Sequence, residues 1–95
     1  MIRKYNGEDL KSLEGPIIVD FYADWCGPCK MLGQILETLE SIDIIKINVD
    51  ENEELAKEYK VMSIPKMLII KDGEVKSEMI GFRSREEIEK EIENI

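Results

Sequence analysis

The chain contains no histidine, and it has only two cysteines among its 95 residues. Without histidine it can use neither Cys–His nucleophilic catalysis nor a metal site built on imidazole ligands. Two cysteines are too few for the disulfide framework of a small secreted scaffold, so a packed core must stabilise the chain. Any proton transfer must therefore use Asp, Glu, Lys or Cys side chains.

Long apolar runs are also missing. No segment approaches the roughly 20 apolar residues of a membrane helix, and the first six residues lack the apolar stretch of a signal peptide. The net charge of −8 argues against a nucleic-acid partner, because phosphate binding needs a basic face. We therefore expect one domain over residues 1–95, a monomer in the cytoplasm that binds neither nucleic acid nor membranes.

Apolar segments and turn residues alternate along the chain in a pattern that predicts both strands and helices. Strands are expected over residues 2–5, 16–22, 44–49, 65–70 and 74–80, and helices over residues 8–13, from Cys26 to about Ser41, around residues 55–59 and after Ser84. Inward-facing positions of the two longer helices are Leu32, Ile35, Leu36, Leu39, Ile88, Ile92 and Ile95.

Three local signals refine this pattern. Asp72-Gly73 suits a two-residue type I′ hairpin turn, so the two flanking strands should be antiparallel. Asn52 is positioned to cap a short helix, and Ser84 and Glu87 form a capping box that opens the last one. We predict an α/β fold with a mixed sheet, parallel first and antiparallel last, and helices on both faces.

The two cysteines stand in the run Trp25-Cys26-Gly27-Pro28-Cys29. Their spacing places both sulfurs at one helix N-terminus, where unpaired N–H groups favour the thiolate of Cys26. Pro28 fits the first helical turn, and Gly27 leaves room for a substrate chain. The pattern predicts that Cys26 attacks a substrate disulfide and that Cys29 resolves the mixed disulfide.

Other uses of a Cys-X-X-Cys pair fit less well. A zinc site needs about four ligands, and the chain offers no second cysteine pair and no histidine. A metal site shared across a dimer remains open as an alternative. A purely structural disulfide is unusual in a reducing compartment. Redox chemistry is the interpretation that we carry forward.

The run from Val19 to Met31 closely resembles the active-site sequence of the thioredoxin family. Cys-Gly-Pro-Cys is the form typical of thioredoxins, whereas glutaredoxins usually carry Pro-Tyr between the cysteines and disulfide isomerases Gly-His. The resemblance extends from Ile17 to the last helix, with a shortened N-terminal strand and helix. It implies a thioredoxin fold and a thiol–disulfide oxidoreductase that reduces protein disulfides and is recharged by a thioredoxin reductase or an equivalent electron donor.

Asp20 interrupts an otherwise apolar strand, so we expect a buried carboxyl group with a raised pKa. The resemblance implies that it relays the proton of Cys29 through water. Lys46 matches the family lysine that neighbours this aspartate. A surface lysine with a buried aliphatic stem is an equally good interpretation of Lys46.

The resemblance also implies a substrate groove. Pro65 matches the cis-proline of the family, which leaves the backbone of Ile64 free to pair with an extended substrate. Gly81 matches the glycine that keeps the groove floor low, although it could simply separate a strand from a helix. Trp25 would form an apolar wall beside Cys26.

The chain departs from the family at several positions near these residues. Lys66 replaces a threonine after Pro65, and Gln34 replaces a proline, which would make the active-site helix straighter. Phe82, Arg83 and Arg85 follow Gly81 where small or neutral residues are usual. Lys66 and Arg83 could place positive charge beside the sulfurs and tune partner choice, or could be ordinary solvated surface charges.

Two other functions remain open at this point. A disulfide oxidant or isomerase could use the same pair, although Gly27-Pro28 speaks against it. A binding or assembly subunit could share the fold without using the cysteines. No cofactor motif is present, so we expect no cofactor, with the Cys26–Cys29 disulfide itself carrying the electrons.

Overall fold

The computed structural model describes residues 1–95 and contains a five-stranded mixed sheet of order β1-β3-β2-β4-β5. The strands are β1 (Ile2–Lys4), β2 (Pro16–Tyr22), β3 (Asp43–Asn48), β4 (Lys66–Lys71) and β5 (Glu74–Ile80). The helices are the 3₁₀ turn η1 (Leu10–Ser12), α1 (Gly27–Leu36), α2 (Glu53–Glu58) and α3 (Arg85–Glu93). β1, β3 and β2 run parallel, and β4 and β5 are antiparallel to their neighbours, as predicted.

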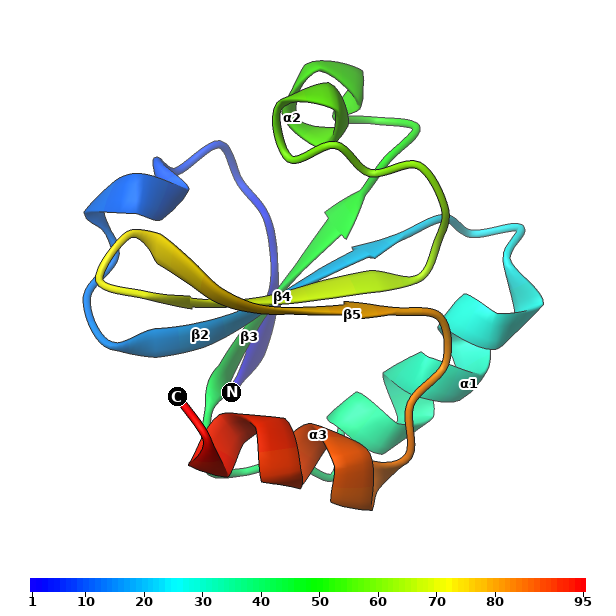
Figure 1. Ribbon diagram of the computed structural model, residues 1–95. Helices are drawn as coiled ribbons and strands as arrows, with labels where there is room; N and C mark the ends of the chain where they lie inside the picture. The colour runs from blue at the N-terminus through cyan, green and yellow to red at the C-terminus, as the bar shows by residue number, and fades with distance from the viewer.

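Helices cover both faces of the sheet, with α1 and α3 on one side and α2 on the other (Figure 1). The first face forms a core of Leu32 and Leu36 from α1, Ile88 from α3 and sheet residues such as Ile18. The second face packs Leu10 of η1 and partly buried side chains of α2 against the sheet. β2 lies between β3 and β4, and its residues from Ile17 to Phe21 are all buried, as expected of a strand covered on both faces.

Helix α1 is shorter than the sequence pattern predicts, because it ends at Leu36 rather than near Ser41. The hydroxyl of Thr38 donates to the carbonyl of Ile35 at 2.7 Å, and the backbone N–H of Thr38 also donates there. Leu39 likewise bonds three residues back, to Leu36. These short-range bonds tighten the chain into a turn, yet Leu39 still reaches the core.

Local turn chemistry mostly follows the sequence. Asp72 and Gly73 both have positive φ, 51° and 86°, as a type I′ turn requires. Ser84 and Glu87 make both bonds of the capping box. Asn52 does occupy the N-cap of α2, but its side chain makes no capping bond and instead donates to the carbonyl of Asn48.

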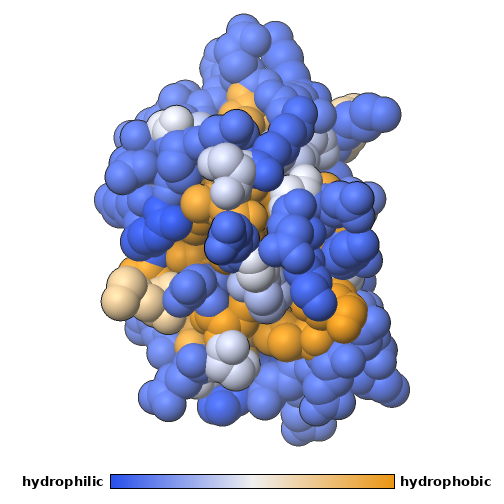
Figure 2. Space-filling view, turned by 90° about the vertical axis from the view of Figure 1, so that its left-hand side faces the viewer, coloured by the Kyte–Doolittle hydropathy of each residue, from blue (hydrophilic) through white to orange (hydrophobic).

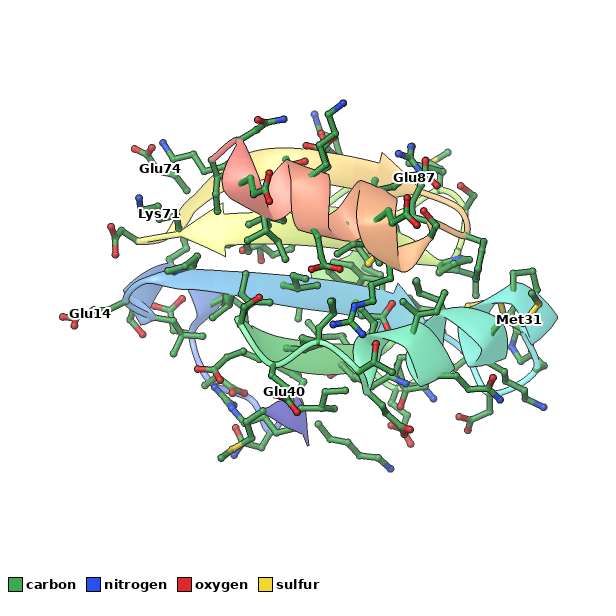
Figure 3. The ribbon with its side chains drawn as sticks, turned by 90° about the horizontal axis from the view of Figure 1, so that it is seen from below. Glu14, Met31, Glu40, Lys71, Glu74 and Glu87 are labelled. Carbon is green, nitrogen blue, oxygen red and sulfur yellow. A yellow bond between two sulfur atoms is a disulfide. The ribbon has the colours of Figure 1, made fainter.

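The end of the molecule opposite the α1 N-terminus is mostly hydrophilic, with apolar side chains showing between the charged ones (Figure 2). Strand β1 lies at one edge of the sheet and α3 covers the opposite edge, over β4 and β5 (Figure 3), so the two chain ends are apart although they overlap in the view of Figure 1. None of the helices combines the length and apolar character needed to cross a bilayer.

Gly73 provides a test of how the hairpin turn is seated. A Cβ atom at this position would lie 2.5 Å from the backbone oxygen of Lys11, whereas a Cβ at Gly7, which also has positive φ, would meet nothing within 4 Å. Gly7→Ala should cost about 1 kcal/mol from left-handed backbone alone, and Gly73→Ala clearly more. Urea unfolding of both variants measures the difference, and equal losses would contradict the close contact with η1.

Candidate active site

Cys26 and Cys29 lie at the N-terminus of α1 and are joined by a disulfide bond. Cys26 is the N-cap residue with an extended backbone, and Cys29 lies in the first turn, which also contains Pro28. The backbone N–H of Cys29 donates to Sγ of Cys26 at 3.2 Å. The helix terminus therefore directs a donor and its partial positive charge at the first sulfur, an arrangement that stabilises a thiolate there after reduction.

Both cysteines are largely enclosed, with Cys26 6% and Cys29 3% exposed. This small difference does not decide which sulfur attacks a substrate. The N-cap position of Cys26 does distinguish the two sulfurs, because the helix N–H donates to the sulfur of Cys26 alone. Gly27 and Pro28 are exposed beside it, and a Cβ at Gly27 would meet no atom within 4 Å, so nothing in the chain blocks approach from this side.

An apolar groove of about 420 Å³ lies next to the disulfide, and we call it the docking groove. Its lining residues are Trp25, Val49, Val61, Met62, Ser63 and Ile64. Ile64 also packs against the cluster that contains both cysteines. A substrate chain in this groove would thus contact the same residue that contacts the disulfide.

The Ile64–Pro65 peptide bond is cis, as the family resemblance implies. The carbonyl of Pro65 accepts the backbone N–H of Gly81 at 2.8 Å, and Gly81 has a positive φ of 85°. That φ favours glycine at the turn between β5 and α3, and a Cβ at this position would meet no atom within 4 Å. The contact fixes Pro65 against the segment that follows β5.

Trp25 is 71% exposed, and its indole Nε1–H donates to Oδ2 of Asp50 at 2.8 Å. Asp50 is itself oriented by a bond from its backbone N–H to the Asn48 side chain. Asp50 was not singled out from the sequence. A signal for it exists, because Asp50 follows β3 just as Trp25 follows β2, and the carboxyl ends of parallel strands meet at one edge of the sheet.

Asp20 is fully buried, and neither carboxylate oxygen has a hydrogen-bond partner in the protein. It faces the α1 side of the sheet, since strand alternation places it on the side of Ile18, which packs with α1. Burial raises the pKa of Asp20 to about 6, opposed by the positive charge of Lys46. The raised pKa expected from the apolar strand is therefore confirmed.

Lys46 stands opposite Asp20 in the β2–β3 register but forms no ion pair with it within 4 Å. Its ammonium group lies 4.5 Å from the centre of the Tyr22 ring and would lie 3.3 Å from a Cβ at Gly33. A cavity of about 380 Å³ contains both Lys46 and Cys29 in its lining. The structure thus places Lys46 in the same cavity as Cys29, with its charge acting on Asp20.

The structure corrects the expectation that Lys66 presents free charge beside the sulfurs. The side chain is only 7% exposed and pairs with Glu78 at 2.9 Å. It points to the α2 face, because β4 alternation places it with Leu68 and Ile70, away from the face of Met67. Arg83 also lies near a carboxylate, 4.0 Å from Glu87.

A buried carboxyl behind a parallel-sheet edge, a cysteine pair at a helix N-terminus and a cis-proline beside an apolar groove define the class of this protein. It is a thiol–disulfide oxidoreductase with a redox-active cysteine pair.

The comparisons with known proteins agree. The thioredoxin family model matches residues 3–94. The chain is 48% identical to the thioredoxin of Bacillus subtilis over 80% of this chain and 78% of that one, and 46% identical to the thioredoxin of Listeria monocytogenes over 88% and 86%. A mutant thioredoxin from Halobacterium salinarum superposes with a TM-score of 0.89 at 35% identity, covering 98% of this chain and 88% of that one. The chain belongs to the thioredoxin family, and it is a protein disulfide reductase with a thioredoxin fold.

The raised pKa of Asp20 predicts how the stability of the folded protein depends on pH. Below about pH 4 the carboxyl is protonated in both folded and unfolded chains and costs nothing. Between that pH and about 6, Asp20 ionises in the unfolded chain but stays protonated in the folded one, so the free energy of unfolding falls as the pH rises. Above about pH 6 the loss is constant, on the order of 3 kcal/mol.

Asp20→Asn removes this titration. At pH 8 the oxidised variant should therefore be more stable than wild type by about 1–3 kcal/mol, and the gain should vanish at low pH. Urea unfolding across this range measures it, with the exposed Glu40→Gln (Figure 3) as a control. A gain that does not change with pH would contradict burial as its source.

Proposed function

We propose that Cys26 is the attacking nucleophile and Cys29 the resolving thiol in the reduction of protein disulfides. The Cys26 thiolate attacks one substrate sulfur, forms a mixed disulfide and releases the other substrate sulfur as a thiolate. Cys29 then attacks Cys26, which releases the second substrate thiolate and restores the intramolecular disulfide. Two electrons pass to the substrate in each cycle. The single observation that carries this assignment is the N–H of Cys29 donating to the sulfur of Cys26.

The docking groove supports an extended protein segment as the substrate. Its lining is apolar apart from Ser63, and the backbone of Ile64 makes no hydrogen bond to the rest of the chain's backbone. Free N–H and carbonyl groups beside a groove can pair with a substrate strand, as in other strand-addition complexes. Of the predicted binding residues, Trp25 and Ile64 line this groove. In our proposal Gly27, Pro28, Pro65 and Gly81 lie outside its lining and complete the binding surface.

Asp20 and Lys46 supply the proton chemistry in this proposal. Asp20 lies under α1, where Cys29 is located, and a carboxyl group with a pKa of about 6 is mostly ionised at neutral pH. It can therefore accept the proton that Cys29 must lose before it attacks. Lys46 lines the same cavity as Cys29 and moderates the rise in the pKa of Asp20.

Family membership supports general reductase and substrate partners. We propose a thioredoxin reductase or an equivalent donor as the source of electrons, and a monomer of one domain acting in the cytoplasm. The reducing conditions of that compartment would keep the pair in the dithiol state that the cycle requires.

Cysteine variants test the assigned roles. In a dithiothreitol-driven insulin reduction assay we expect activity in wild type only, because each half of the cycle needs one of the two thiols. After reduction and removal of dithiothreitol, Cys29→Ser should form a covalent adduct with the substrate, visible by non-reducing electrophoresis, and Cys26→Ser should not. Full biological activity in Cys26→Ser would instead favour a binding or assembly subunit.

The pH dependence of turnover tests Asp20. Wild-type turnover should fall as the pH drops through about 6, because a protonated Asp20 no longer accepts the proton of Cys29. Asp20→Asn should turn over more slowly at neutral pH, by up to about 100-fold if this proton transfer limits the rate, and without the inflection near 6. Rates that match wild type from pH 5 to 8 would remove Asp20 from the cycle.

A further inference from the structure

Lys66 occupies the first position of β4, directly after Pro65, where a lysine is unusual because the side chain is buried. Its side chain is almost fully buried, and a buried ammonium group is costly unless its donors are paired. All three donors have acceptors here. They are Oε1 of Glu78 at 2.9 Å and the carbonyls of Tyr59 and Lys60, both at 3.3 Å.

The two carbonyls belong to the C-terminal end of α2. That end closes with Lys60 at a positive φ of 56°, and the N–H groups of Lys60 and Val61 bond back to Lys57 and Ala56. These two bonds satisfy earlier carbonyls and form a Schellman motif. The carbonyls of Tyr59 and Lys60 lie beyond them, and the ammonium group of Lys66 binds both, with a charge that also suits a helix C-terminus.

Residues 61–64, which we call the docking segment, run between these two points. All four residues line the docking groove. Three of them are apolar, and the fourth is Ser63. The segment begins after Lys60 and ends at Pro65, whose carbonyl is held by Gly81. Lys66 connects the two ends directly, from β4 back to Lys60, while Glu78 anchors the ammonium group to β5.

We propose that Lys66 is a positioning residue that holds the docking segment in its substrate-binding shape. Its ammonium group closes the base of the loop, so the free backbone of Ile64 is presented without first being ordered by the substrate. Preorganisation of this kind improves binding by lowering the entropy lost on association. The inference rests on the proposed use of the docking groove by protein substrates.

The test compares two disulfide substrates under turnover, with dithiothreitol as the reductant and its direct reduction of each substrate subtracted. In the proposed function insulin binds in the docking groove, whereas bis(2-hydroxyethyl) disulfide is too small to pair with the docking segment. Lys66→Met keeps the shape of the side chain and removes its charge and donors. It should raise KM for insulin roughly fivefold with little change in kcat, and should leave the rate with the small disulfide unchanged.

Two further variants complete the design. Glu78→Gln keeps both carbonyl contacts of Lys66 and should raise KM for insulin by less than Lys66→Met does, and its half-exposed side chain keeps the test usable should Lys66→Met fold poorly. Lys71→Met removes an exposed lysine at the far end of the same strand (Figure 3) and should change neither rate.

The outcomes separate cleanly. An unchanged KM for insulin in both Lys66→Met and Glu78→Gln overturns the positioning role, as does an equal loss of rate with insulin and the small disulfide. Failure of wild type itself to reduce insulin, with the small disulfide still reduced, would count against the proposed protein substrates instead.

Discussion

One contact makes the two cysteines inequivalent, the backbone N–H of Cys29 donating to the sulfur of Cys26. That contact exists only if α1 begins at Gly27, directly after the loop that leaves β2. The helix is held there by Leu32 and Leu36, which are completely buried against the sheet. A reactive sulfur at the rim of the molecule is therefore fixed by apolar packing several residues further along the same helix.

The buried Asp20 reduces the stability that this packing provides. A carboxyl group without a hydrogen-bond partner in the middle of the sheet destabilises the fold whenever it is ionised. The flanking residues Val19 and Phe21 face the other core, so β2 is anchored from both sides and can hold such a group. The positive charge of Lys46 lowers the free-energy cost of ionising Asp20, although the two side chains form no direct ion pair. If Asp20 transfers protons as proposed, that function comes at the expense of stability, which the surrounding strands provide.

Sequence patterns predicted the elements whose signal is local. β2 and β5 have the predicted bounds, and the Asp72-Gly73 turn and the Ser84 capping box form as expected, because each depends on residues that are neighbours in the chain. The end of α1 was predicted about five residues too late, since Leu39 keeps a helical spacing although Thr38 has already turned the chain.

The candidate site divides in the same way. The cysteine pair and the buried carboxyl could be identified from sequence, and the cis-proline from family resemblance alone. The roles of Asp50 and Lys66 could not, because each depends on a contact with a segment distant in the fold. Lysine is usually a surface residue, and only the contacts with Glu78 and with the end of α2 explain why Lys66 is buried.

The cysteine pair has a further consequence, which follows from its isolation. No third thiol exists in the chain, so the oxidised form has a single possible internal pairing and cannot rearrange into a wrong one. Each molecule then stores either two reducing equivalents or none, apart from short-lived adducts with other proteins. The electrons held by a population of these molecules at any moment therefore equal two for each molecule in the dithiol state.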